Sequence, residues 1–213
     1  MNIKTAREEL QQCGRALAEK GLVWGHSGNI SVRLNRNSFV ISAGGTHLGR
    51  LTDADMVKCH IGHDGYEGTV RPSMEAGLHR GIYQCCPQAG AIIHSQPLYS
   101  TLAACSDIDI RTDFLPEAMA YLGNIAMVPY HHAGSIELAE ATAEAAMQSQ
   151  VLILKNHGVI CHDTSLQAAG LKTEALEFAC RLLVASRASG IALKYLGENV
   201  AEDFLKHLRD IGR

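Results

Sequence analysis

Two stretches of this chain each place a pair of β-rich runs on either side of a short turn, and this arrangement limits the folds open to it. The first is "ISVRLNRNSFVIS" (30–42), in which the turn-forming residues "NRNS" separate the runs. The second is "VLILKNHGVICHD" (151–163), with a tight turn at "NHG". Strands joined this closely run antiparallel, because a parallel pair needs a crossover of about a dozen residues or more. We therefore expect a sheet that is at least partly antiparallel.

Helical patterns alternate with the strand patterns along the chain. Apolar residues at helical spacing predict a helix over 3–20, a second one that begins with Ser73 as its N-cap, and a third that begins at Ser135. Further helices are expected at about 97–105, 164–188 and 200–211, and further strands at 90–94 and 124–130. No repeat or linker divides the chain. We predict one α/β domain over residues 1–213, a three-layer α/β/α sandwich around a mixed, largely antiparallel sheet.

Composition excludes several classes of partner. The formal net charge is −3 and no run of basic residues occurs, so a nucleic-acid partner is not expected. The polar N-terminal stretch lacks the apolar core of a secretory signal, and no window of about 18 apolar residues suggests a membrane span. The seven cysteines show no CxxC spacing. We therefore expect a reduced, cytoplasmic protein without a membrane partner.

Polar side chains lie where several of the expected elements begin or end. Glu75 falls in the first turn of a helix, His94 ends a strand in "AIIHSQPLYST", His157 lies in a turn, and Asn29 lies in a glycine-containing loop. A carboxylate and two imidazoles on separate elements could hold a divalent ion. Each residue also has a structural alternative, since a single histidine is more often a packed or surface group and a glutamate can interact with a helix dipole. The residues alone leave both interpretations open.

Six sequence blocks, taken together, are more specific than any one of these residues. They are, in chain order, "GNIS" (28–31), "ISAGG…LGRLTDADMV" (41–57), "RPSMEAGLHRGIY" (71–83), "AIIHSQPLYST" (91–101), "VPYHHAGSIELAE" (128–140) and "LILKNHGVI" (152–160). In order and spacing they resemble the class II aldolase/adducin family over nearly the whole chain. The resemblance implies the fold of that family and a homotetramer.

The resemblance also implies roles for the residues at the element ends. Glu75 corresponds to the acid/base glutamate, which also touches the metal, and His94 and His157 correspond to metal ligands. The block that usually reads His-x-His reads His94-Ser95-Gln96 here. Gln96 could be a weak ligand that favours an ion such as Mn²⁺ over Zn²⁺, could leave a position open for water or substrate, or could mark a degenerate site.

The expected anion pocket departs from the family pattern as well. In the phosphate-using members, a Gly-Asn loop, a Thr/Ser-Gly pair and two consecutive serines surround the phosphate. The corresponding residues here are Gly28, Asn29, Ala43, Gly44, Ser73 and Met74. Two hydroxyl groups are therefore lost, at Ala43 and Met74. A carboxylate or a neutral substrate becomes more plausible, although backbone amides could still bind a phosphate.

Four other histidines have expected roles near this site. His79 lies four residues after Glu75 and so shares its helix face, which predicts that it supports Glu75. His131 or His132 could replace the missing ligand, and His26 could contact an anionic substrate.

The resemblance implies a metal-dependent carbon–carbon lyase, an aldolase or a decarboxylase. Its substrate would be a small hydroxy-keto sugar, sugar phosphate or acid, and its cofactor Zn²⁺ or Mn²⁺. Cleavage next to a carbonyl leaves an enediolate, and a divalent ion stabilises its negative charge. Two alternatives remain from other branches of the family: a sugar-phosphate epimerase that breaks and remakes a bond, and a non-catalytic interaction domain.

Overall fold

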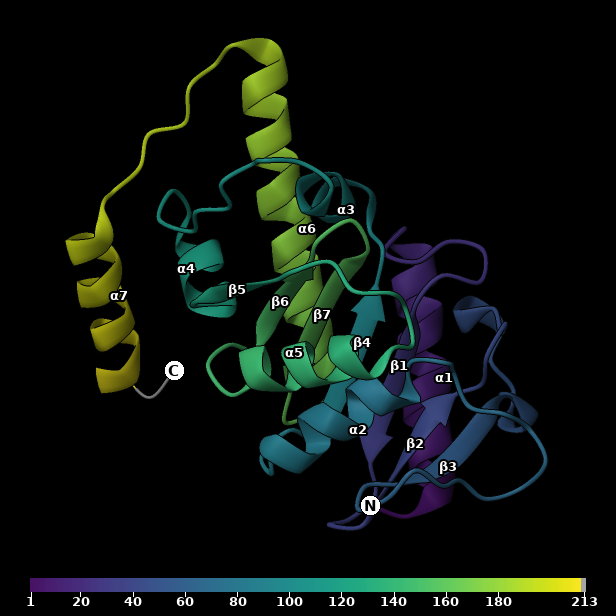
Figure 1. The fold of residues 1–213 in the computed structure, drawn as a ribbon. Helices are drawn as coiled ribbons and strands as arrows, with labels where there is room; N and C mark the ends of the chain where they lie inside the picture. Colours follow the sequence, from purple (N-terminus) through teal and green to yellow (C-terminus); the bar gives the residue numbers. More distant parts are fainter. Residues whose placement is uncertain (212–213) are drawn as a thin grey trace.

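A computed structural model describes residues 1–211 and places seven strands in one sheet (Figure 1). The strand order is β3-β2-β1-β4-β7-β6-β5. The strands are β1 (Asn29–Arg33), β2 (Ser38–Ser42), β3 (Met56–His60), β4 (Ala91–Ser95), β5 (Ile125–Val128), β6 (Val151–Leu154) and β7 (Gly158–Asp163).

Both predicted hairpins form. β1 pairs antiparallel with β2, and β6 pairs antiparallel with β7 through a turn that joins Leu154 to its partner Gly158. β4 lies between the two hairpins and is antiparallel to both β1 and β7. Among the strand pairs of residues 1–211, only β5–β6 is parallel. The prediction of a mixed, largely antiparallel sheet is confirmed.

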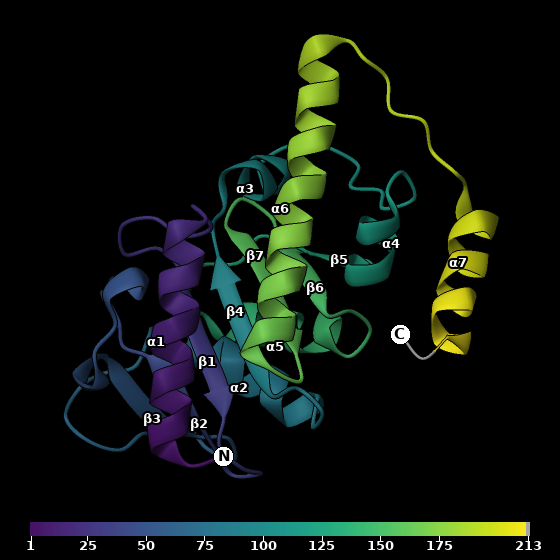
Figure 2. The same ribbon diagram turned by 180° about the vertical axis from the view of Figure 1, so that it is seen from behind.

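Helices cover both faces of the sheet. Figure 1 shows α2 and α5 in front of the strands, and the view from behind in Figure 2 shows α1 and α6 across the opposite face. The α/β/α layering is therefore confirmed. The helices are α1 (Ile3–Glu19), α2 (Ala76–Cys85), α3 (Leu98–Ala104), α4 (Pro116–Leu122), α5 (Ile136–Ala146), α6 (Leu166–Ser189) and α7 (Glu198–Asp210), with short 3₁₀ turns η1 (Leu48–Arg50) and η2 (Asp53–Asp55).

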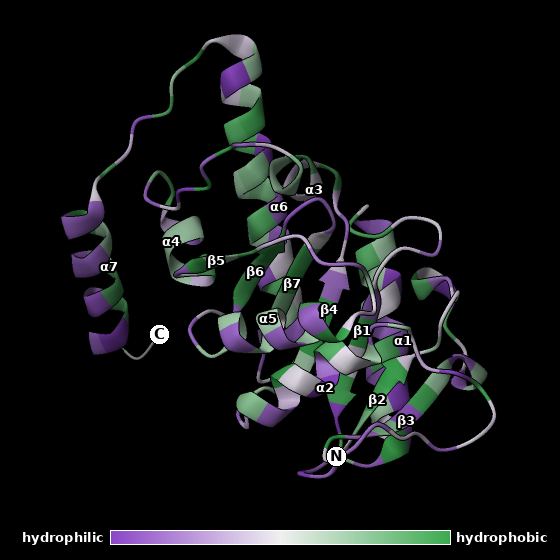
Figure 3. Ribbon diagram, viewed as in Figure 1, coloured by the Kyte–Doolittle hydropathy of each residue, from purple (hydrophilic) through white to green (hydrophobic). Residues whose placement is uncertain are grey.

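The alternation of side chains along β4 determines which layer each residue enters. Ile92 packs in the core beneath α2 and α5, whereas Ile93 packs in the core beneath α1 and the start of α6. His94 is two residues after Ile92 and therefore faces the α2 side. Figure 3 shows that the C-terminal tip of β4 is hydrophilic, whereas much of the neighbouring strands is hydrophobic.

Three details differ from the sequence-based expectations. Ser73 is not the N-cap of α2, because the helix begins later and Glu75 occupies the N-cap position. The edge strand β3 and the short helix α4 were not predicted. Ser135 does cap α5, as expected, by accepting a hydrogen bond from the Leu138 amide at 3.1 Å.

The C-terminal helix α7 lies apart from the sheet, beside α4 (Figures 1 and 2). The segment before it is held by Asp113, which accepts hydrogen bonds from the Leu196 and Gly197 amides at 2.8 and 2.9 Å. Among residues 1–211, none of the helices combines the length and apolar character that crossing a bilayer requires.

Candidate active site

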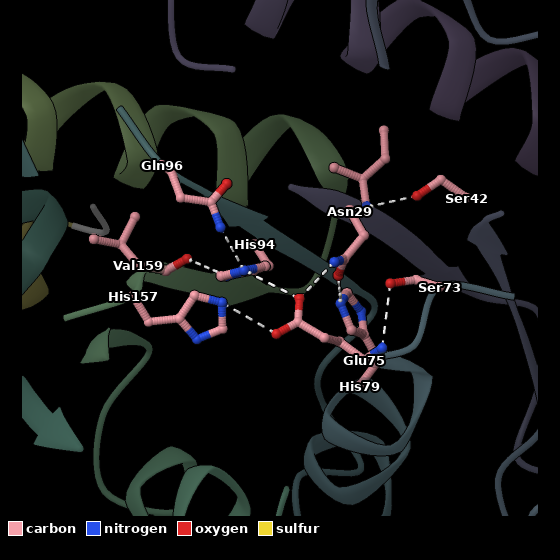
Figure 4. Close-up of polar contacts among 10 residues, drawn as sticks. Asn29, Ser42, Ser73, Glu75, His79, His94, Gln96, His157 and Val159 are labelled. Atoms are coloured by element: carbon pink, nitrogen blue, oxygen red, sulfur yellow. Dashed lines mark hydrogen bonds and ion pairs between the residues drawn. The ribbon is translucent and has the colours of Figure 1, made fainter. Parts of the chain in front are cut away.

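Three polar side chains from distant parts of the sequence meet at one end of the sheet (Figure 4). Glu75 comes from the start of α2, His94 from β4, and His157 from the β6–β7 turn. Their candidate ligand atoms all lie within 4.8 Å of one another. His94 Nε2 is 3.2 Å from Glu75 Oε2, and His157 Nε2 is 3.2 Å from Glu75 Oε1. The structure thus brings together the three residues that the sequence singled out.

Backbone contacts orient His94 for this role. Its Nδ1 donates a hydrogen bond to the Val159 carbonyl at 2.9 Å across the β4–β7 pair, and the side chain is fully buried. The other ring nitrogen, Nε2, therefore faces Glu75. A metal-binding histidine commonly has this arrangement, in which one ring nitrogen donates to a carbonyl and the other binds the ion.

The three groups shift one another's proton affinity. Burial tends to raise the pKa of the Glu75 carboxyl, but His94, His157 and the hydrogen bond from Asn29 outweigh it and lower that pKa. Burial tends to lower the pKa of His94, yet the adjacent Glu75 carboxylate raises it. Burial and the neighbouring His94 lower the pKa of His157. Glu75 is therefore ionised and His157 neutral near pH 7, which are the forms that bind a divalent ion.

Gln96 extends this group on the same side of β4. Its Nε2 lies 2.8 Å from His94 Nε2, a contact that is a hydrogen bond only when His94 Nε2 carries no proton. Its Oε1 is buried, has no hydrogen-bond partner among the described residues, and points away from Glu75 and His157 (Figure 4). Glu75 Oε1 is also buried, and its 3.2 Å contact with His157 Nε2 is not a well-formed hydrogen bond. A buried carboxylate beside two imidazoles matches the donor set of a divalent ion, so these residues fit one.

A glycine makes room for Gln96. A Cβ atom at Gly158 would lie 2.7 Å from the Ser95 carbonyl oxygen and 2.9 Å from Gln96 Cγ. Both distances are shorter than side chains tolerate. The absence of a side chain at residue 158 therefore allows the Gln96 side chain to lie against the turn that carries His157.

The residues expected to form an anion pocket lie next to one another. Ala43 pairs with Pro72 in an isolated β-bridge, and the Ser73 amide donates to the Ser42 carbonyl at 3.1 Å. The Gly44 amide donates to the Arg71 carbonyl at 3.3 Å, so two of the expected backbone donors already have protein partners.

Gly28, Asn29 and Ser73 each have contacts of their own. A Cβ atom at Gly28, whose φ is +78°, would lie 2.6 Å from the His94 carbonyl oxygen, so this glycine permits close contact with β4. The Asn29 side chain binds Glu75 rather than facing an open pocket. Ser73 Oγ accepts a hydrogen bond from the Glu75 amide at 3.3 Å and keeps its own proton to donate.

His79 does support Glu75, but through Asn29. Asn29 Nδ2 donates to Glu75 Oε2 at 2.8 Å, and His79 Nε2 lies 2.5 Å from Asn29 Oδ1. Burial lowers the pKa of His79 to about 3, so it is neutral at pH 7. Sequence reasoning missed Ser31 and Tyr83, which continue this network. Their spacing could have revealed them, because Ser31 follows Asn29 by two residues on a strand and Tyr83 follows His79 by four on a helix.

The remaining histidines stand outside the ligand cluster. Within residues 1–211 neither His131 nor His132 joins the group of potential ligands, and His132 Nδ1 lies 3.2 Å from the Tyr130 hydroxyl. His26 is exposed, with its ring 6.4 Å from that of His47. The structure therefore gives no support to a replacement ligand from the 131–132 pair.

The sequence also matches a known protein family. Residues 8–184 match the Class II Aldolase and Adducin N-terminal domain. The chain belongs to this family. The match covers every strand of the described residues, the cluster of Glu75, His94 and His157, and Gln96.

Individual relatives are similar over most of their length. A 3-oxo-tetronate 4-phosphate decarboxylase of Haemophilus influenzae is 31% identical over 206 residues, which cover 92% of this chain and 94% of the relative. An L-fuculose phosphate aldolase of Methanocaldococcus jannaschii is 35% identical over 168 residues, covering 79% and 90%. A solved L-fuculose 1-phosphate aldolase superposes with a TM-score of 0.89 at 25% identity, covering 98% of each chain.

The family and its members define the class of chemistry. The chain is an enzyme, a carbon–carbon lyase of the metal-dependent aldolase and decarboxylase type. The cluster of Glu75, His94 and His157 supplies the side chains that such an enzyme needs for a divalent ion.

Proposed function

We propose that this enzyme breaks a carbon–carbon bond next to a carbonyl in a small hydroxy-keto compound, with a divalent ion held by Glu75, His94, Gln96 and His157. The observation that carries the proposal is the convergence of Glu75, His94 and His157 from three separate segments, with ligand atoms within 4.8 Å. Glu75 and His94 are buried and His157 is partly buried, and a buried carboxylate requires a charged partner or a metal ion.

The chemistry follows from the charge that develops when such a bond breaks. A divalent ion at this site supplies Lewis-acid stabilisation of negative charge on the carbonyl side. Glu75 moves the proton, because it is ionised and buried and its Oε1 receives no hydrogen bond from the described residues, although His157 Nε2 lies 3.2 Å away. Oε1 would take up the proton when it is not bound to the ion. Asn29 holds the other oxygen, Oε2, by donating its amide hydrogen to it.

We assign the fourth donor to the carboxamide oxygen of Gln96. A neutral oxygen binds a harder ion better than it binds a soft one, so Mn²⁺ is favoured over Zn²⁺ relative to a site with three histidines. Gln96 Nε2 faces His94 in the structure, so this assignment requires the amide to turn over, and Oε1 has no hydrogen bond that would prevent this among the described residues. The presence of Glu75, His94 and His157 supports it over a degenerate site.

The group remote from the reacting bond would bind along Gly28, Asn29, Ala43, Gly44 and Ser73. The named relatives act on phosphate esters. Here the Ser73 hydroxyl remains as a side-chain donor, while Ala43 has no hydroxyl and the Asn29 amide is bound to Glu75. We infer a substrate with a carboxylate or neutral end, which needs fewer donors than a phosphate dianion.

The wider assignments also remain proposals. We take residues 1–213 as one domain of a cytoplasmic homotetramer that acts on a small molecule, and we assign no nucleic-acid or membrane partner to it.

A substrate panel tests the proposed reaction. The protein, reconstituted with Mn²⁺ or Zn²⁺, is incubated with hydroxy-keto acids and sugars in matched phosphorylated and unphosphorylated forms, and NMR identifies the products. We expect an aldehyde or CO₂ as product, faster turnover of the unphosphorylated forms, and loss of turnover in Glu75→Gln. A product that is only an epimer of the substrate, or equal turnover in Glu75→Gln, would contradict the proposal.

A further inference from the structure

A series of buried polar side chains leads from the core to Glu75. Its members come from one face of a strand and one face of a helix. Asn29 and Ser31 point to the same face of β1 because strand side chains alternate. Glu75, His79 and Tyr83 follow one another at intervals of four, which places them along one side of α2. This face of β1 packs against this side of α2, so residues of the strand alternate with residues of the helix along the series. All five residues are at most 5% exposed, so their polar groups depend on one another for hydrogen bonds.

The contacts form one continuous series. The Tyr83 hydroxyl is 2.8 Å from Ser31 Oγ, which is 2.6 Å from His79 Nδ1. His79 Nε2 is 2.5 Å from Asn29 Oδ1, and Asn29 Nδ2 is 2.8 Å from Glu75 Oε2. Figure 4 shows the last part of the series, with Asn29 between His79 and Glu75. No solvent-exposed group interrupts it.

The charge of Glu75 sets the direction of every hydrogen bond in the series. An ionised carboxylate only accepts, so the Asn29 amide must turn its Nδ2 toward Glu75 and its Oδ1 toward His79. Oδ1 accepts as well, so His79 must carry its proton on Nε2. Its Nδ1 then accepts from the Ser31 hydroxyl, which accepts from Tyr83. If donors and acceptors were exchanged along the series, Asn29 Oδ1 would lie against the Glu75 carboxylate. Two buried acceptors would then face each other without a hydrogen between them.

We propose that His79 is a positioning residue of the active site: as the Nε2–H tautomer it locks the Asn29 amide, which holds Glu75 Oε2 and leaves Oε1 for the reaction. The catalytic part of this inference rests on the proposed function. The tautomer part stands on the hydrogen-bond geometry alone. Ser31 and Tyr83 act one step further away, by fixing the tautomer of His79.

Two variants of His79 separate its two contacts. In His79→Gln the amide nitrogen takes the place of Nε2 and still donates to Asn29. In His79→Asn the shorter side chain reaches only the region of Nδ1, so the contact with Ser31 remains and the donor to Asn29 is lost. We expect kcat of His79→Gln to stay within about threefold of the native value. We expect kcat of His79→Asn to fall at least about tenfold, with KM changed less than about twofold.

A measurement on the native protein keeps the inference testable if a variant fails to fold. ¹⁵N NMR shifts of the His79 ring report its tautomer directly, and we expect protonated Nε2 and unprotonated Nδ1. Absence of lyase activity from the native protein would overturn the proposed function but would leave this readout intact. Protonated Nδ1, or equal kcat values for His79→Asn and His79→Gln in an active enzyme, would overturn the positioning role.

Discussion

Gln96 lies two residues after His94, where the His-x-His block of the resemblance would place a second histidine. Replacing it by histidine should add a third imidazole beside Glu75, His94 and His157. Imidazole nitrogen is a better donor to Zn²⁺ than a carboxamide oxygen. We predict that Gln96→His raises Zn²⁺ affinity by at least about tenfold, or about 1.4 kcal/mol, as measured by calorimetric titration.

The exposed residue Gln12 on α1 provides the control for an added imidazole. Gln12→His should leave Zn²⁺ affinity at this site unchanged, because it lies on the opposite layer of the fold. Equal Zn²⁺ affinities of the native protein and Gln96→His would mean that the side chain at residue 96 points away from the ion.

Residue 158 is a glycine because the β6–β7 turn passes close to the end of β4. In Gly158→Ala the new Cβ would collide with the Ser95 carbonyl oxygen and Gln96 Cγ, at 2.7 and 2.9 Å. We predict a loss of about 1–3 kcal/mol of unfolding free energy in urea titration, because the backbone must shift. The control, Gly62→Ala, has no atom within 4 Å of the added Cβ and should change stability by less than about 0.5 kcal/mol. Equal effects would contradict the packing argument.

His162 makes stability depend on pH. It is buried on β7, its Nε2 donates to the Ser149 carbonyl at 3.0 Å, and burial lowers its pKa. Below the unfolded pKa of about 6.5 the unfolded chain takes up a proton that the folded chain resists, so stability is lost as pH falls. We predict that unfolding free energy, measured between pH 7 and 5, declines less steeply in His162→Gln. Identical slopes would show that His162 is protonated equally in both states.

At the scale of elements, a glutamate on α6 holds the start of α3. Glu177 accepts hydrogen bonds from the Tyr99 and Ser100 amides at 2.9 and 2.8 Å, and from the Ser100 hydroxyl. These amides are unsatisfied helix donors, and α3 has no side-chain cap of its own. Because α3 follows Gln96 and Pro97 directly, this contact also holds the end of β4.

We predict that Glu177→Ala lowers the unfolding free energy by about 1–3 kcal/mol, since two partly buried amide donors and a hydroxyl lose their acceptor. Glu174, one turn earlier on α6, pairs with Lys20 at the surface. Glu174→Ala should cost less than about 1 kcal/mol. Chemical denaturation of both variants measures the two losses of unfolding free energy. Equal losses would contradict a capping role for Glu177.

Elements with strong local signals were predictable from the sequence. The two hairpins, α1 and α6 were expected close to where they occur, because turn residues and helical spacing are local properties. β3 was missed because its run "MVKCH" contains a single β-branched residue and depends on pairing with β2. α4 was missed because a helix of seven residues is unstable alone and forms by packing against α6.

At the scale of the whole molecule, the site exists only when β1, α2, β4 and the β6–β7 turn are all in place. The sequence could identify Glu75, His94 and His157 as candidates, and the family resemblance joined them. Their convergence could not be derived from spacing, because it depends on the order of strands in the sheet. His79 was expected to support Glu75, whereas Ser31 and Tyr83 were missed. Their spacing from Asn29 and His79 is regular, but only the packing of α2 against β1 joins the two series.

The central claim is that Glu75, His94 and His157 hold one divalent ion. The most direct test is calorimetric titration with Mn²⁺ and Zn²⁺ of the metal-stripped native chain and of His157→Ala, with exposed His207→Ala as control. His157 is preferred to His94 for the substitution because His94 is fully buried and its loss would also perturb the core. We predict one ion per chain for the native protein and His207→Ala, and at least about hundredfold weaker binding by His157→Ala with an unchanged circular dichroism spectrum. Native-like ion affinity in folded His157→Ala, or no ion bound by the native chain, would contradict the account.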